Sequence, residues 1–132
     1  MPDRLPPSLT EIEELAQRAL GTIPRRLKRY LGPVVIQVDE FPDEETEAAM
    51  GLDSPFDILG LYSGVALPHK SINDPRPDLD MVFLYRRPML DFWVAGEETL
   101  GDLVAHVLVH EIGHHFGLSD ADMHHLENSV VD

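Results

Sequence analysis

The sequence contains no cysteine among its 132 residues. This absence excludes a disulfide scaffold, a metal site built from thiolates and a cysteine nucleophile. Basic residues are also scarce, because 10 Lys and Arg stand against 24 Asp and Glu, for a formal net charge of −14. A surface of that sign repels a phosphate backbone, so we expect no nucleic-acid partner.

Long apolar runs are missing as well. No segment reaches the roughly 20 apolar residues that span a bilayer, and the opening MPDRLPPSLTEIEE lacks the apolar stretch of a signal peptide. We therefore expect a soluble, cytoplasmic protein with no membrane partner. Length and a hydrophobic content of 43% predict one folded domain over residues 1–132, with residues 1–7 as a flexible arm.

The N-terminal part of the chain has a helical pattern. Thr10 and Glu13 have the form of a capping box, and the apolar residues that follow share one helical face: Ile12, Leu15, Ala16 and Leu20. Residues 24–31 are expected to form a second short helix or a turn. This segment holds the only basic cluster of the chain, for which a solvated helix face is the favoured interpretation.

The middle of the chain predicts strands. Residues 33–41, 58–67 and 81–87 are rich in β-branched or aromatic residues, and Pro88 is expected to stop the last of them. Between the first two, residues 43–57 are acidic and interrupted by glycine and proline. We interpret them as a loop that could hold one helical turn.

The clearest element lies near the C-terminus. Residues 96–118 predict a long, half-buried helix that ends at Gly117, where glycine allows a left-handed turn. Its acidic residues cluster at the N-terminal end, where the helix dipole favours them. Its apolar stripe consists of Leu100, Leu103, Val104, Val107, Leu108 and Ile112.

Six of the seven histidines lie between His106 and His125, and His110-Glu111-Ile112-Gly113-His114 fits the motif H-E-x-x-H. Histidines four apart on a helix point the same way, so both can bind one Zn²⁺. Glu111 is turned about 100° from His110 and can take a proton from a water whose pKa the zinc lowers to about 7. His106 has the same spacing from His110, but Val107 stands where the base would be, so His106 is not a predicted ligand.

The motif extends to H-E-x-x-H-x-x-G-x-x-D, because Gly117 and Asp120 follow it. Gly117 lets the chain reverse, and Asp120 can then return to the metal as a third protein ligand. The fourth position stays open for water, as a catalytic zinc requires. The same segment also fits a helix start, so Asp122, His124 or Glu127 remain alternative ligands, and Asp122 could orient a ligand imidazole instead.

These residues resemble the zincins, and the extended motif resembles the metzincin variant with Asp120 in place of the third histidine. More closely, the chain resembles a small, single-domain bacterial family of zincin-like metallopeptidases. The likeness covers EIEELAQRAL, VVIQVDE, LGLYSGVAL, VFLYRRPM and HEIGHHFGLSDADM. It implies an α+β fold in which a short mixed β-sheet packs against a long active-site helix with flanking helices, and a sheet edge lies beside the metal.

The predicted function is zinc-dependent hydrolysis of peptide bonds. Glu111 is the predicted catalytic base, and one Zn²⁺ per chain is held by His110, His114 and Asp120. Two alternatives remain open: a zinc-binding or interaction domain of zincin fold that cleaves nothing, and a zinc hydrolase of a small amide.

The expected partner is a peptide or protein substrate that adds to a sheet edge, for which residues 58–67 are the candidate. Tyr62 and Tyr85 could stabilise an oxyanion near the zinc, although packing in the core is the favoured interpretation of both. The oligomeric state is not defined by these patterns.

Overall fold

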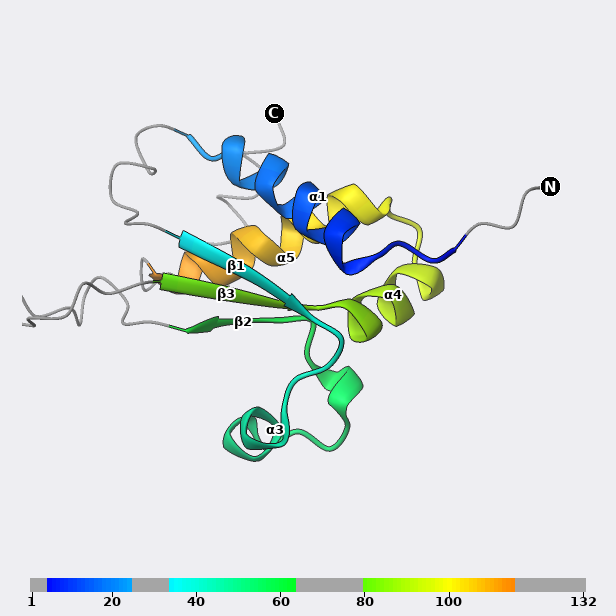
Figure 1. Ribbon diagram of the computed structural model, residues 1–132, viewed down its shortest axis with the longest axis vertical. Coiled ribbons are helices and arrows are strands. Elements are labelled where there is room, and N and C mark those ends of the chain that lie inside the picture. The colour runs from blue at the N-terminus through cyan, green and yellow to red at the C-terminus, as the bar shows by residue number, and fades with distance from the viewer. Residues whose placement is uncertain (1–4, 25–33, 64–79, 116–132) are drawn as a thin grey trace, which may run out of the picture.

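The computed structural model describes residues 5–24, 34–63 and 80–115. Four helices, a 3-10 turn and a small mixed sheet make up this part of the chain, which confirms the α+β fold class (Figure 1). The elements follow one another as α1 (Leu9–Gly21), β1 (Val34–Asp39), α3 (Glu44–Met50), η1 (Pro55–Asp57), β2 (Gly60–Ser63), β3 (Asp80–Tyr85), α4 (Arg86–Ala95) and α5 (Leu100–His115).

The three described strands are ordered β1-β3-β2. The central strand β3 runs parallel to β1 and antiparallel to β2, with Gly60 opposite Leu84. Ile36, Val82 and Leu84 are buried, whereas Val35 is 39% exposed, as alternation in a sheet covered on one face requires. All three predicted strands are present, and β2 lies at an edge of the described sheet, as predicted.

Helix α1 is confirmed, but its N-cap is not the predicted one. Ser8 caps the helix, and its side-chain oxygen accepts a hydrogen bond from the N–H of Glu11 at 3.1 Å. The spacing Ser8-x-x-Glu11 therefore takes the place of the predicted box of Thr10 and Glu13, because the chain becomes helical one residue before Thr10.

The acidic segment before β2 is more helical than predicted. Asp43 caps α3 by accepting a 2.7 Å hydrogen bond from the Thr46 N–H, and Gly51 ends the helix at a positive φ of 64°. None of the residues of α3 is buried, and Figure 1 shows the helix projecting away from the sheet. Without an apolar stripe the helix has no periodic signal in the sequence, and its caps and acidic first turn stabilise it locally.

The predicted third strand is shorter than expected, and the helix that follows it was not predicted. Strand β3 ends at Tyr85, and α4 begins at Arg86, so Pro88 lies in the first turn of the helix. Proline has no backbone N–H, and in the first turn this costs no helical hydrogen bond. Arg86 anchors this junction: its Nε donates to the Pro7 carbonyl at 2.6 Å and its Nη1 pairs with Glu40 at 3.0 Å.

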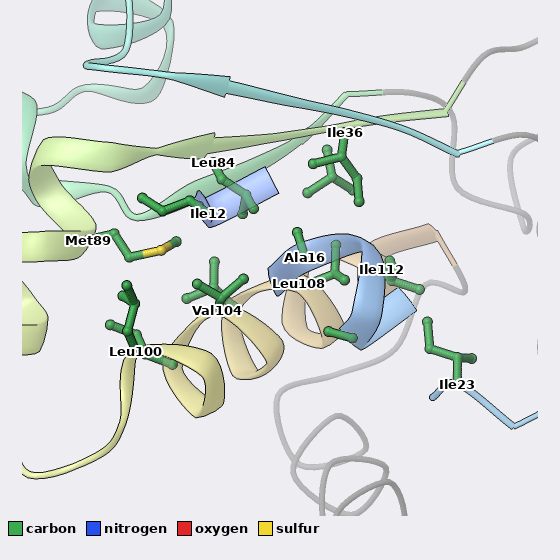
Figure 2. Close-up of a cluster of buried hydrophobic side chains, with 14 residues drawn as sticks. Ile12, Ala16, Ile23, Ile36, Leu84, Met89, Leu100, Val104, Leu108 and Ile112 are labelled. Atoms are coloured by element: carbon green, nitrogen blue, oxygen red, sulfur yellow. The ribbon is translucent and has the colours of Figure 1, made fainter. Parts of the chain in front are cut away.

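Helix α5 supplies more of the described core than any other element. All six residues of its predicted apolar stripe are buried, and Figure 2 shows Val104 and Leu108 facing the sheet and α1. Helix α1 contributes Ile12 and Ala16 to the same cluster, and β3 contributes Leu84. The packing of α1 and α5 on one face of the sheet confirms the expected architecture, in which the helix with the histidines lies against a short sheet.

Several expectations fall outside the described residues: the end of the long helix at Gly117, residues 64–67 of the second predicted strand, residues 1–4 of the predicted arm and all but the first residue of the segment 24–31. Of the predicted arm, residues 5–7 form neither helix nor strand, and Leu5 is 89% exposed. None of the helices described is long and apolar enough to cross a bilayer.

Candidate functional site

The histidine pair of the motif lies on one face of α5. His110 and His114 are one helical turn apart, and their ring centroids lie 5.3 Å from each other with the planes at 67°. His110 is half-buried, and the His114 side chain is 45% exposed. Two imidazoles at this separation are the donor type and spacing that zinc takes from an H-E-x-x-H helix.

Glu111 is the one charged residue that is buried in the described part of the chain, with 8% of its surface exposed. Its Oε1 accepts a hydrogen bond from the main-chain N–H of Tyr62 at 3.0 Å and lies 3.4 Å from Nδ1 of His114. The carboxylate is therefore held between a histidine of its own helix and the backbone of strand β2.

The surroundings of Glu111 act on its pKa in opposite directions. Burial raises the pKa above its usual value, while the neighbouring imidazoles of His114 and His110 and the Tyr62 N–H lower it. Burial is the largest of these effects, so the net pKa is raised. A raised carboxyl pKa is typical of a group that both accepts and returns a proton near neutral pH.

Two residues of strand β2 direct main-chain groups to the side on which this carboxylate lies. The Tyr85 N–H donates to the Leu59 carbonyl at 3.0 Å, which makes this opposing pair a hydrogen-bonded one. Such pairs alternate along antiparallel strands, so the N–H and C=O groups of Gly60 and Tyr62 point away from β3. The contact between Tyr62 and Glu111 is made from this outer edge.

A pocket of about 250 Å³ opens between the start of β2 and α5. Its walls come from residues 57–60 and from His106, Val107, His110 and Glu111. A larger hollow of about 1080 Å³ lies elsewhere, between residues 5–7 and α4. The smaller pocket is the better candidate for a site, because two residues of the motif line it and none lines the larger one.

The remaining predicted ligands are not described. Asp120 and its alternatives Asp122, His124 and Glu127 lie outside the described residues, and within those residues no group of three potential metal-binding side chains occurs. The two imidazoles of α5 nevertheless fit zinc in donor chemistry, and a third ligand would have to come from beyond residue 115.

The two tyrosines considered from the sequence are both packed. Tyr62 is partly buried against the core, and Tyr85 is 3% exposed. Burial, and then the carboxylates of Asp39, Asp43 and Glu111, raise the pKa of Tyr85 to about 12. The sequence did not reveal that the backbone N–H of Tyr62 contacts Glu111. Almost every residue has a backbone N–H, so the residue type at position 62 gives no sign of this contact.

A helix that bears H-E-x-x-H beneath the edge of a short mixed sheet defines a zincin-type protein. The chain belongs to the zincin-like metallopeptidase family, whose model matches residues 31–130. No curated protein matches the sequence.

Proposed function

We propose that the chain is a zinc-dependent peptidase. His110, Glu111 and His114 form the site at which it hydrolyses the peptide bonds of a substrate. The proposal rests on one arrangement: a buried carboxylate beside two histidines of one helical face, next to the outer edge of a strand. His110 and His114 hold one Zn²⁺ per chain, and Asp120 is the proposed third ligand. Family membership supports a metallopeptidase as the general class.

Glu111 is the proposed general base. Bound zinc polarises the substrate carbonyl and lowers the pKa of water. Glu111 accepts a proton from the attacking water while the water oxygen bonds to the carbonyl carbon. It then donates that proton to the amine nitrogen as the C–N bond breaks, so the products are a carboxylic acid and an amine.

An extended peptide is the substrate form that suits this edge. The outward main-chain groups of Gly60 can pair with a peptide added beside β2, as in other cases of strand addition. The pocket next to Gly60 would receive one side chain of that peptide, against the apolar walls of Leu59 and Val107.

Glu111→Gln tests the proposed role. The amide has nearly the same volume and can still accept the Tyr62 N–H, so zinc content and folding should not change. Turnover of a peptide library should fall by about 10² or more, the usual scale for a positioned general base. Zinc content, thermal unfolding and cleavage are measured on the same preparations.

Other results would favour the alternatives. Loss of zinc in Glu111→Gln would make Glu111 a ligand and contradict its role as base. A wild-type protein that binds zinc and cleaves nothing in a broad peptide library would favour a non-catalytic zinc-binding domain. Cleavage confined to small amides would favour the small-amide hydrolase.

A further inference from the structure

Gly60 lies at a close approach of β2 to α5. A Cβ atom at this position would meet Cγ1 of Val107 at 2.8 Å, the carbonyl oxygen of Phe83 at 3.1 Å and Cδ2 of Leu84 at 3.3 Å. The first distance is shorter than packed carbon atoms tolerate, whereas the other two would require only a slight shift of their neighbours. The strand therefore reaches this position because residue 60 has no side chain.

Two residues further along β2, the main chain meets the same helix again. Gly60 contacts Val107, and the Tyr62 N–H contacts Glu111. Two residues of a strand advance about 6.7 Å, and four residues of a helix advance about 6 Å. The distance along β2 between the two contacts therefore matches the distance along α5. A displacement of β2 at Gly60 is therefore passed on to the hydrogen bond between Tyr62 and Glu111.

We propose that Gly60 is a positioning residue for Glu111. By letting β2 lie directly against Val107, it brings the Tyr62 N–H to Oε1 of Glu111 and holds the carboxylate in one orientation. The second oxygen, Oε2, then accepts the proton of the attacking water. The inference rests on the proposed function for its catalytic consequence, whereas the hydrogen bond that it depends on can be measured without turnover.

Because of this hydrogen bond, the two outward-facing residues of β2 have different roles. The N–H of Tyr62 serves Glu111, so an extended substrate pairs with the N–H and C=O of Gly60 instead. One strand thus positions the base with one residue and receives the substrate backbone with the residue two positions before it.

The test is Gly60→Ala, with Gly60→Ala/Val107→Ala as the rescue variant and Val107→Ala as its reference. Removing Cγ1 of Val107 removes the 2.8 Å conflict, so the strand can return. Gly101→Ala is the matched control, because a Cβ there meets only Cδ2 of Leu15 at an ordinary 3.7 Å. Amide hydrogen exchange at Tyr62, followed by NMR on the zinc-loaded proteins, reports the hydrogen bond.

We expect the exchange rate of the Tyr62 amide to rise by about 10-fold or more in Gly60→Ala, to return toward the wild-type rate in the rescue variant and to stay unchanged in Gly101→Ala. The value kcat should follow the same pattern, with a loss of about 10-fold in Gly60→Ala and little change in zinc content, while KM should also rise because the displaced strand carries the main-chain groups that pair with the substrate. That loss should stay below the loss in Glu111→Gln, because the base is displaced and not removed.

Unchanged exchange at Tyr62 in Gly60→Ala would overturn the proposal, as would faster exchange with an unchanged kcat. If Gly60→Ala does not fold, the pair Glu111→Ala and Glu111→Gln measures the same hydrogen bond, since only the first removes the acceptor. Equal exchange at Tyr62 in that pair would also overturn it. Absence of cleavage by the wild type would refute the proposed function, and the exchange measurements would still decide whether Gly60 holds the two elements together.

Discussion

Tyr85 shows how strongly the fold can change a single ionisable residue. Its phenol is buried at the junction of β3 and α4, within the field of Asp39, Asp43 and Glu111, and its pKa is raised to about 12. Because an unfolded tyrosine ionises near pH 10, the unfolded state releases this proton first when the pH rises. The neutral phenol thus favours the folded state up to about pH 10, and that contribution is lost between about pH 10 and 12.

We therefore predict that Tyr85→Phe flattens the alkaline part of the stability profile. The free energy of unfolding of the wild type should fall more steeply between about pH 10 and 12 than that of Tyr85→Phe, which has no proton to lose there. Urea unfolding at a series of alkaline pH values measures both slopes. Equal slopes would show that Tyr85 ionises normally in the folded protein.

Which histidines bind zinc is a second prediction at the scale of single residues. His106, His110 and His114 lie one turn apart along α5, and only the last two flank Glu111. His110→Ala and His114→Ala should each abolish stoichiometric zinc binding, because two imidazoles are needed before a third ligand can complete the site. His106→Ala should keep about one zinc per chain in elemental analysis of the purified protein. A loss of zinc in His106→Ala alone would move the site one turn toward the N-terminus.

At the scale of elements, caps decide where helices begin. Helix α1 packs Ile12 and Ala16 into the core, so fraying at its start weakens the whole domain. Ser8→Ala should lower the free energy of unfolding by about 1 kcal/mol, since it removes the acceptor for the Glu11 N–H. Thr10→Ala should change it by less than about 0.5 kcal/mol, as expected for an exposed site without a cap. Chemical unfolding compares the two, and a larger effect of Thr10→Ala would restore the capping box expected from the sequence.

At the scale of the whole molecule, zinc binding and folding should be coupled. Both histidines belong to α5, the helix that packs against the sheet and α1, so a metal bound there stabilises only the folded state. With free zinc at about 100 times its Kd, linkage gives about 2.7 kcal/mol, which corresponds to a rise in Tm on the order of 10 °C.

Removal of zinc by a chelator should therefore lower the Tm of the wild type by on the order of 10 °C. His110→Ala should show no such shift, and His106→Ala should behave as the wild type does. Differential scanning calorimetry with and without chelator measures all three proteins. An equal shift in His110→Ala would place the stabilising metal elsewhere on the chain.

Most of the secondary structure near the site could be predicted because its signals are local. The stripe from Leu100 to Ile112 identifies α5 and its buried face, and the spacing of His110 and His114 follows from helical geometry alone. Helix α3 was expected only as one possible turn, because it buries no residue and so has no apolar stripe. Helix α4 was not predicted, because Pro88 in its first turn resembles a stop signal.

The sequence by itself determined which helix bears the histidines, which of its faces is buried and that Glu111 lies beside His110 and His114. Only the tertiary structure decided that the backbone of β2, which lies at an edge of the described sheet, meets this carboxylate. Tyr62 and Glu111 are 49 residues apart, and the donor is an N–H that almost every residue possesses. Gly60 is the one residue whose type reflects that contact. A side chain at position 60 would collide with Val107, and the two residues become neighbours only when the chain folds.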